Sequence, residues 1–326
     1  MKKIVKIAGI IILFVVVLAA AAATYISVAL PDVGPAESLT IEGTPERIER
    51  GKYLAWSVSV CMDCHSTRDW SKFSGPIVPG TTGKGGERFD QSVGLPGVFY
   101  SRNITPEGLA RYSDGELVRV ITTGVTKEGV AMFPLMPYPN YGKMDREDVY
   151  SIVAYLRTLE PIASEVPRSK PDFPVNILIH TMPQKADPQK RPDASDPLAY
   201  GKYLTGISGC AECHTPFEKG KSLREFSLSG NREFRLPDGS VVRSANITPD
   251  PMTGIGKWTM AQFVSRFKNY SDSAFVLPVV KPGEFNTIMP WTMYGSMKED
   301  DLKAIFTYLQ SVNPITKKVE TFSTGK

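Results

Sequence analysis

Two short motifs, CMDCH at residues 61–65 and CAECH at residues 210–214, each combine two cysteines with a histidine that directly follows the second one. The chain has four cysteines, and the two motifs contain all of them. A C-x-x-C-H motif can serve as a redox-active thiol pair, as part of a zinc site or as an anchor for haem. The remaining sequence has to decide among these three chemistries.

A redox pair, a zinc site and a disulfide each fit this sequence poorly. A thioredoxin-like pair needs alternating strands and helices, which the pattern of apolar residues does not predict. Zinc takes four ligands. Each motif supplies three, and the only other histidine is His180, so only a composite site between the motifs would complete the set. A disulfide within one motif would close a very short loop and add little stability.

Covalent haem attachment is the chemistry for which C-x-x-C-H is the specific signal. The two thiols of each motif would bond the haem vinyl groups, and the histidine would lie beneath the iron. The sequence therefore predicts two covalently bound haem c groups. The predicted cofactor-binding residues are Cys61, Cys64 and His65 for one haem and Cys210, Cys213 and His214 for the other.

A methionine opposite each histidine would complete the iron ligands and raise the reduction potential. Met136 and Met289 occupy matched positions, and each is followed by a proline in a loop. Met144 and Met297 are also matched, but they lie at the starts of predicted helices. We favour Met136 and Met289 because a loop is freer to bring sulfur to the iron, and the other pair remains the alternative.

The two motifs belong to a duplicated unit. The first repeat is expected at residues 43–160 and the second repeat at residues 198–326, each forming one domain. A proline-rich segment at residues 161–197 is expected to be a stiff, extended linker. The matched segments are GKYL at 51–54 and 201–204, NITP at 103–106 and 246–249, and the stretches 136–162 and 289–315.

Each repeat is expected to be mainly α-helical, with long loops between its helices. Asp145 is the predicted N-cap of a helix near the end of the first repeat. Gly51 would let a second helix cross this one closely, with Tyr155 filling the crossing. Such a loop-rich domain needs a large group at its centre. The apolar stripe of the predicted helix is Val149, Ile152, Val153 and Leu156, and its counterpart is Leu302, Ile305, Phe306 and Leu309.

The N-terminal segment, residues 1–31, predicts a membrane anchor. Three lysines precede an uncharged run from Ile7 to Leu30, which is long enough to cross a bilayer as a helix. The positive-inside rule then places the N-terminus in the cytoplasm and the two repeats on the outer side. A cleaved signal peptide is the alternative. The net charge of +4 comes without a dense basic block, so nothing points to nucleic acid.

Several other residues have two readings each. Asn103 and Asn246 either hydrogen-bond a haem propionate or shape a turn. Tyr112 and Trp258 either reach a propionate or pack against the haem face. His180 has no counterpart and is not expected to contact iron. The glycine-rich GKGGERF at 83–89 lacks the phosphate-binding pattern and is expected to be a surface loop.

The segments CMDCHST, NITPDP with TGIGKW, and MPWTMYGSMKEDDLKAIFTYL resemble those of class I c-type cytochromes, over about residues 45–315. More narrowly, they are similar to the cytochrome c subunits of bacterial membrane-bound alcohol, aldehyde and gluconate dehydrogenases. The resemblance implies two tandem class I cytochrome c domains. It also implies that His65 and Met136 ligate one iron and His214 and Met289 the other. Those subunits commonly have three haem domains, whereas this chain has two C-x-x-C-H motifs.

The leading interpretation is a membrane-anchored dihaem cytochrome that carries single electrons on the periplasmic face. Its donor would be a dehydrogenase or another respiratory protein, and its acceptor an oxidase or a further cytochrome. The protein would serve as an electron-transfer subunit rather than as an enzyme by itself, and no catalytic residues are predicted. The alternative is a haem enzyme with one open iron, such as a dihaem peroxidase or a thiosulfate-oxidising cytochrome. A haem-based sensor is a third class.

Overall fold

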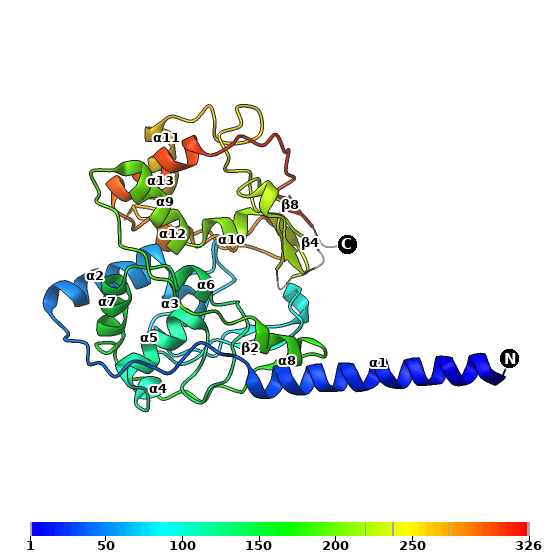
Figure 1. Cartoon of the computed structure of the whole chain (residues 1–326). Helices are drawn as coiled ribbons and strands as arrows, with labels where there is room; N and C mark the ends of the chain where they lie inside the picture. The colour runs from blue at the N-terminus through cyan, green and yellow to red at the C-terminus, as the bar shows by residue number, and fades with distance from the viewer. Residues whose placement is uncertain (1, 219, 237, 273, 325–326) are drawn as a thin grey trace.

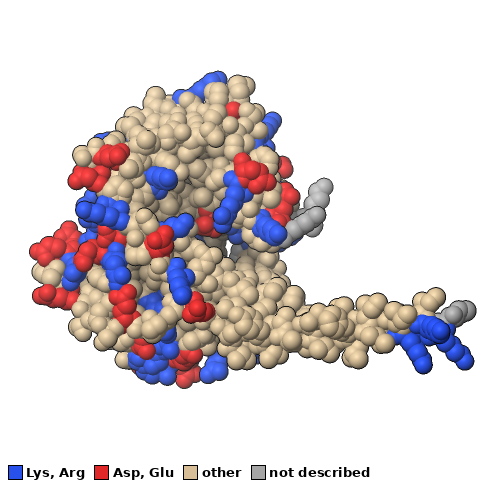
Figure 2. Space-filling view, in the orientation of Figure 1, with Lys and Arg blue, Asp and Glu red and all other residues tan. Residues whose placement is uncertain are grey.

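The computed structural model describes residues 2–218, 220–236, 238–272 and 274–324 (Figure 1). The first repeat and the second repeat lie against each other, and a long N-terminal helix projects away from the first repeat. This helix, α1, spans Lys2–Ala29. It has no buried residue, and Figure 2 shows an uncharged surface beyond its lysines. Its length and composition suit a membrane span, and an N-terminal signal sequence would satisfy the same criteria.

The first repeat is built mainly from short helices. Helices α2 and α7 pack together, and β1 pairs with β2 in a small antiparallel sheet. The elements are α2 Pro45–Tyr53, the π-helical turn η1 Leu54–Val58, α3 Cys61–Cys64, β1 Arg88–Phe89, the 3-10 turn η2 Gln91–Val93, β2 Gly97–Tyr100, α4 Pro106–Leu109, α5 Asp114–Thr123, α6 Tyr138–Tyr141 and α7 Arg146–Leu156.

The second repeat follows the same helical order with more strands. Its longest pair, α9 and α13, pack together as α2 and α7 do. The elements are α9 Pro197–Ile207, α10 Cys210–His214, β4 Phe217–Glu218, β5 Lys221–Ser222, the 3-10 turn η4 Arg224–Phe226, β6 Glu233–Arg235, β7 Val241–Arg243, α11 Met260–Lys268, α12 Trp291–Tyr294, α13 Glu299–Ser311 and β8 Phe322–Ser323.

The predicted close crossing of helices is present in both repeats. A Cβ added at Gly51 in α2 would lie 1.8 Å from the carbonyl oxygen of Ser151 and 2.8 Å from Cβ of Tyr155 in α7. A Cβ added at Gly201 in α9 would lie 1.9 Å from the carbonyl oxygen of Ala304 in α13. Each glycine therefore permits backbone contact between two helices.

The predicted terminal helices are confirmed, and the N-cap is confirmed in the first repeat. Asp145 accepts a hydrogen bond from the backbone N–H of Glu147 at the start of α7. At the corresponding position of α13, Lys298 makes no side-chain cap. The predicted apolar stripes of both helices are buried. The hydrophobic periodicity thus identified the helices that form the centre of each repeat.

A one-residue difference between the repeats is accommodated by a wider helical turn. Six residues separate Leu54 from Cys61, whereas five separate Leu204 from Cys210. In the first repeat, η1 forms a π-helical turn in which the N–H of Ser59 donates to the carbonyl of Leu54 at 2.7 Å. In the second repeat, α9 stays α-helical up to Ile207. The extra residue is absorbed before the first cysteine, as single-residue insertions in helices often are.

Two features of the loops were not expected from the sequence. In the described part of the chain, three small antiparallel sheets accompany the helices: β1–β2 with β3 Lys170–Pro171, β4–β5 and β6–β7–β8. Strands of two to four residues are too short to show an alternating pattern. The segment 161–197 is not simply extended, because it contains β3 Lys170–Pro171, α8 Val175–Leu178 and the 3-10 turn η3 Ile179–Thr181.

This segment is also attached to the first repeat. Strand β3 pairs with β2, and the N–H of Asp187 donates to the carbonyl of Gly142 at 2.9 Å. Nη1 of Arg191 lies 2.6 Å from Oδ1 of Asp148, a carboxylate with no exposed surface. Hydrogen bonds and ion pairs therefore hold the segment against the first repeat along much of its length.

Candidate functional site

The four cysteines lie on two short helices that begin in the same way. In α3 and α10, the cysteines three positions apart share one face of the helix. The residue before each helix has a left-handed backbone, with φ of 42° at Val60 and 67° at Gly209. This conformation turns the chain sharply out of the preceding helix. It presents both thiols of each motif on one side.

The four thiols of the two motifs are unpaired. Cys64 and Cys213 are exposed and the other two are half-buried. Burial raises the pKa of Cys61, Cys64 and Cys210 to about 12, and it also raises the pKa of Cys213. Each pair thus has one accessible thiol and one half-buried thiol, and both could form covalent bonds to a haem.

Each motif histidine is oriented by a backbone carbonyl. Nδ1 of His65 lies 2.6 Å from the carbonyl oxygen of Arg102, and Nδ1 of His214 lies 2.7 Å from that of Ala245. A carbonyl can only accept, so Nδ1 carries the proton and Nε2 keeps its lone pair. Burial lowers the pKa of both histidines, partly opposed by these hydrogen bonds. Both rings are therefore neutral with Nε2 available to bind a metal.

Two glycines hydrogen-bond to the motif histidines and lie close to the carbonyls of Arg102 and Ala245, and sequence reasoning missed them. The N–H of Gly85 donates to the carbonyl of His65 at 2.8 Å, and that of Gly230 donates to the carbonyl of His214 at 2.7 Å. An added Cβ at Gly85 would lie 2.4 Å from the carbonyl carbon of Arg102. The glycine-rich segment 83–89 is thus part of the site rather than only a surface loop. The glycines at positions 85 and 230, each ahead of its NITP segment, were the available signal in the sequence.

The two candidate pairs of methionines differ in burial. Met144 and Met297 are 0% and 1% exposed and lie inside the apolar core. Met136 and Met289 are only partly buried and border that core from the loops before α6 and α12. A residue that already fills the core has no free side to offer a haem, whereas a residue at the border does. The burial pattern favours Met136 and Met289 as ligands.

The two asparagines shape turns, which is one of the two roles expected for them. Oδ1 of Asn103 accepts from N and Oγ1 of Thr105 at 2.9 and 2.7 Å. Asn246 accepts from Thr248 in the same way. The amide of Asn103 donates to the carbonyl of Ile162 at 2.8 Å. These bonds tie the NITP turns to the segments that follow the terminal helices.

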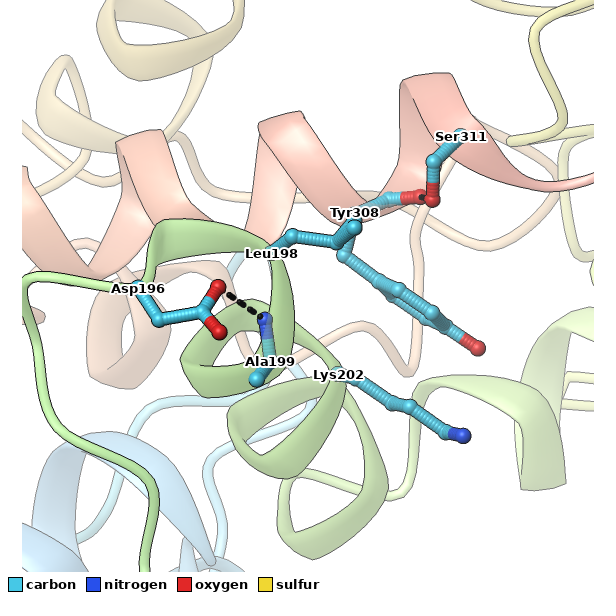
Figure 3. A pocket seen from close by; sticks show the side chains of 6 residues that line it. All are labelled: Asp196, Leu198, Ala199, Lys202, Tyr308 and Ser311. Carbon is cyan, nitrogen blue, oxygen red and sulfur yellow. Dashed lines mark hydrogen bonds between the residues drawn. The ribbon is translucent and has the colours of Figure 1, made fainter.

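The three remaining candidate residues are His180, Tyr112 and Trp258. His180 is beside the end of α1, where its Nδ1 is 3.2 Å from the carbonyl oxygen of Leu30. Trp258 is 38% exposed, and Tyr112 is partly buried against the core. A surface hollow of about 310 Å³ lies between α9 and α13. Figure 3 shows the side chains that line it, among them Lys202 and Tyr308. None of the predicted site residues lines this hollow.

The cysteines and histidines of the two motifs are placed to hold haem rather than to form a zinc site. Within residues 2–218, 220–236, 238–272 and 274–324, no three His, Cys, Asp or Glu side chains come together to hold a metal ion. Each motif instead offers two thiols on one helical face and one imidazole with a free Nε2. This donor set matches covalent attachment of haem with histidine beneath the iron.

Comparison with known proteins points to the same cofactor. The sequence profile of the cytochrome c family matches residues 198–313. The cytochrome c subunit of alcohol dehydrogenase (quinone) from Gluconacetobacter polyoxogenes is 28% identical over 304 residues, which cover 86% of this chain and 59% of that subunit. The cytochrome c subunit of gluconate 2-dehydrogenase from Pantoea cypripedii is 27% identical over 287 residues, with 81% and 59% coverage.

A shorter relative matches over most of its own length. The "Diheme cytochrome c-type" protein of Cereibacter sphaeroides is 27% identical over 286 residues, which cover 84% of this chain and 88% of the relative. By contrast, the chain spans 59% of the length of the two dehydrogenase subunits. Residues 198–313 therefore form a cytochrome c domain, and cytochrome c subunits of bacterial dehydrogenases are among the relatives of this chain.

Proposed function

We propose that this protein is a dihaem c-type cytochrome that carries single electrons as a subunit of, or partner to, a membrane-bound dehydrogenase. One haem would be attached at Cys61 and Cys64 in a domain at residues 43–160. The second would be attached at Cys210 and Cys213 in a domain at residues 198–326. The observation that carries this proposal is the repeated histidine geometry. Both motif histidines donate from Nδ1 to a backbone carbonyl and keep Nε2 free.

The chain's own residues have defined tasks in this proposal. Bound haem would supply a one-electron couple at iron. His65 and His214 would hold the two irons from one side, and their hydrogen bonds to the backbone would fix the ring orientation and strengthen the ligand. Met136 and Met289 would close the opposite side, which raises the reduction potential and excludes other ligands.

The two repeats support a carrier better than an enzyme with one open iron. Catalysis at one haem needs that haem to differ in its ligands from the other. Here each repeat provides the same donors: two cysteines, one oriented histidine and one methionine at the border of the core. This equivalence favours two closed irons.

The proposed location and partners follow from α1 and from the relatives. As a retained anchor, α1 would hold both haem domains on the periplasmic face, with the lysines Lys2, Lys3 and Lys6 in the cytoplasm. The cytochrome c subunits of alcohol and gluconate dehydrogenases among the relatives make a dehydrogenase the proposed electron donor. The acceptor would be an oxidase or another periplasmic redox protein.

Carbon monoxide binding to the dithionite-reduced protein tests the proposal, after intact mass has shown two haems per chain. We expect an unchanged Soret band for the natural protein, because both irons are closed. Met136→Ala and Met289→Ala should each open one iron, so that about half of the band shifts. Met144→Ala is the control and should lower stability without opening an iron. One haem per chain, or carbon monoxide binding by the natural protein, would contradict the proposal.

A further inference from the structure

Residues 70–74 of the first repeat lie against the loop that carries Met289 in the second repeat. Lys72 forms an isolated antiparallel bridge with Val279. The rings of Phe73 and Tyr270 stack with their centroids 5.8 Å apart. The first repeat therefore contributes directly to the surroundings of the proposed ligand loop of the second haem.

The contact closest to Met289 is made by a buried serine. Ser74 is 1% exposed, and its Oγ donates to the carbonyl oxygen of Met289 at 2.6 Å. The same Oγ accepts from the N–H of Trp291 at 3.1 Å. The hydroxyl thus joins the residues on both sides of the proline that follows Met289. It is placed to fix the backbone from which the methionine sulfur extends.

A buried asparagine holds the serine in register with this loop. Asn286 is 5% exposed, and its Oδ1 accepts from the N–H of Ser74 at 2.9 Å and from that of Thr287 at 2.8 Å. Its Nδ2 lies 3.3 Å from the carbonyl oxygens of both Trp70 and Lys72. The side chain of Asn286 therefore hydrogen-bonds to three backbone groups of the 70–74 segment, those of Trp70, Lys72 and Ser74.

The serine is also anchored within its own repeat. Ser74 has a left-handed backbone with φ of 64°, which is uncommon for a residue other than glycine. Nη2 of Arg68 donates to the carbonyl of Ser74 at 2.7 Å, and Nη1 of Arg68 donates to Asp63 at 2.8 Å. Asp63 lies between the two cysteines of the first motif. A continuous set of contacts thus runs from the first haem anchor to Met289.

The loop that carries Met136 has no equivalent support. In both loops a turn bond closes behind the methionine, from Tyr138 N to the carbonyl of Met136 at 2.7 Å and from Trp291 N to that of Met289 at 2.8 Å. Within the described part of the chain, no side chain of the second repeat hydrogen-bonds to the backbone of Met136. The two proposed haems therefore differ in what holds their methionine.

We propose that Ser74 is a positioning residue for Met289, so that methionine ligation of the second haem depends on a residue of the first repeat. This inference rests on the proposed function, in which Met289 ligates iron. Loss of the hydroxyl should loosen the loop and weaken the bond between sulfur and iron in the second haem only. The first haem should keep its ligands, because Met136 is held within its own repeat.

Ser74→Gly in the full-length haem-loaded protein is the sharpest test. Glycine accepts a φ of 64° without strain, so the variant removes the hydroxyl and leaves the backbone conformation favoured. A hydrogen bond of ordinary net strength corresponds to roughly a fivefold change in an equilibrium constant. We expect the equilibrium constant for release of Met289 from the second iron to rise roughly fivefold, so that one reduced haem binds carbon monoxide where the natural protein binds none and the other haem stays unchanged.

The control removes a similar hydroxyl from the same interface. Oγ of Ser57 in the first repeat lies 2.7 Å from Oγ of Ser296 in the second repeat, away from the Met289 peptide. Ser57→Ala should leave carbon monoxide binding at the natural level. An equal rise in Ser57→Ala and Ser74→Gly would mean that the interface is merely loosened, and it would overturn the proposal.

Two combinations assign the effect to one haem. Combined with Met289→Ala, Ser74→Gly should add nothing, because that iron is already open. Combined with Met136→Ala, it should raise the affinity of the one closed haem that remains. If Met289→Ala opens an iron and Ser74→Gly has no effect on carbon monoxide binding, the positioning role of Ser74 is wrong and the proposed function is unaffected. If Met289→Ala opens no iron, both the positioning role of Ser74 and the proposed ligation by Met289 are wrong.

Discussion

The hydroxyl of Tyr53 in the first repeat donates to Oδ2 of Asp301 in the second repeat at 2.5 Å. The reverse contact is also present, since the hydroxyl of Tyr203 donates to Oδ2 of Asp148 at 2.7 Å. The tyrosines occupy matched positions in the two GKYL segments, and the aspartates occupy matched positions in α7 and α13. The duplicated units therefore contact each other reciprocally, in the manner of a two-fold symmetric dimer within one chain.

The first prediction concerns this reciprocal contact. Tyr53→Phe removes the partner of Asp301 and of the backbone N–H of Lys298, which donates to the same hydroxyl at 3.1 Å. Leaving these groups without that partner should lower the free energy of unfolding by about 1–3 kcal/mol, measured in urea. Tyr150→Phe, on α7 but outside this contact, should change it by less than about 0.5 kcal/mol. Equal stability of both variants would contradict a structural role for the reciprocal pair.

The second prediction concerns the helix crossings. Gly51→Ala and Gly201→Ala each place a Cβ within 2 Å of a backbone carbonyl oxygen on the crossing helix. Because a backbone cannot move aside as a side chain can, each variant should lose roughly 2–3 kcal/mol or fail to accumulate as folded protein. Thermal unfolding and soluble yield are the measurements.

Gly206 provides the matched control for both variants. It lies on α9 like Gly201, but an added Cβ would have no atom within 4 Å. Gly206→Ala should therefore stabilise the protein by up to about 1 kcal/mol through helix propensity alone. A loss of stability in this variant similar to that in Gly201→Ala would show that close packing is not the cause.

Local sequence patterns predicted the central helices, but they could not predict which backbone carbonyls accept hydrogen bonds. The stripe that begins at Val149 and the glycine at position 51 carry their information in residue type and spacing. The acceptors of the motif histidines are carbonyls of Arg102 and Ala245, and any residue type supplies a carbonyl. Only the position directly before each NITP segment distinguishes them, so their role could not be read from their side chains.

Contacts between the two repeats could not be predicted from the sequence either. Pairing Tyr53 with Asp301 depends on how the two repeats are placed against each other, and no periodicity encodes that placement. The small sheets were missed for a different reason, because β6 and β7 have only three residues each, too few to show an alternating pattern. The π-helical turn was within reach, since the one-residue difference between the repeats precedes Cys61.

The third prediction concerns acid stability. Burial raises the pKa of Asp148, but hydrogen bonds and charge from Arg50, together with Tyr203 and Arg191, outweigh this, and the pKa lies below its ordinary value. A carboxyl whose pKa is lower in the folded state stabilises the protein above its unfolded pKa of about 3.9. This contribution is lost as the pH falls through the lower folded pKa.

Asp148→Asn should therefore destabilise the protein by about 2–3 kcal/mol at pH 7. The difference from the natural protein should narrow progressively below about pH 4, because the natural carboxyl then becomes neutral as well. Urea unfolding at several pH values measures this difference. Glu165→Gln, which alters an exposed carboxylate, should follow the natural protein throughout. A difference that does not change with pH would contradict the electrostatic explanation.

The last prediction concerns the histidine carbonyl in the first repeat. Gly85→Ala would crowd the carbonyl carbon of Arg102, whose oxygen accepts from Nδ1 of His65. Weakening this hydrogen bond makes the imidazole a poorer electron donor, so the potential of one haem should rise in a potentiometric titration. Gly86→Ala is a matched control, because Gly86 also has a positive φ but an added Cβ would meet nothing within 4 Å. Both variants should lose about 1–2 kcal/mol of stability through backbone strain, and only Gly85→Ala should shift the potential. Equal potentials in the two variants would show that the Arg102 carbonyl does not tune His65.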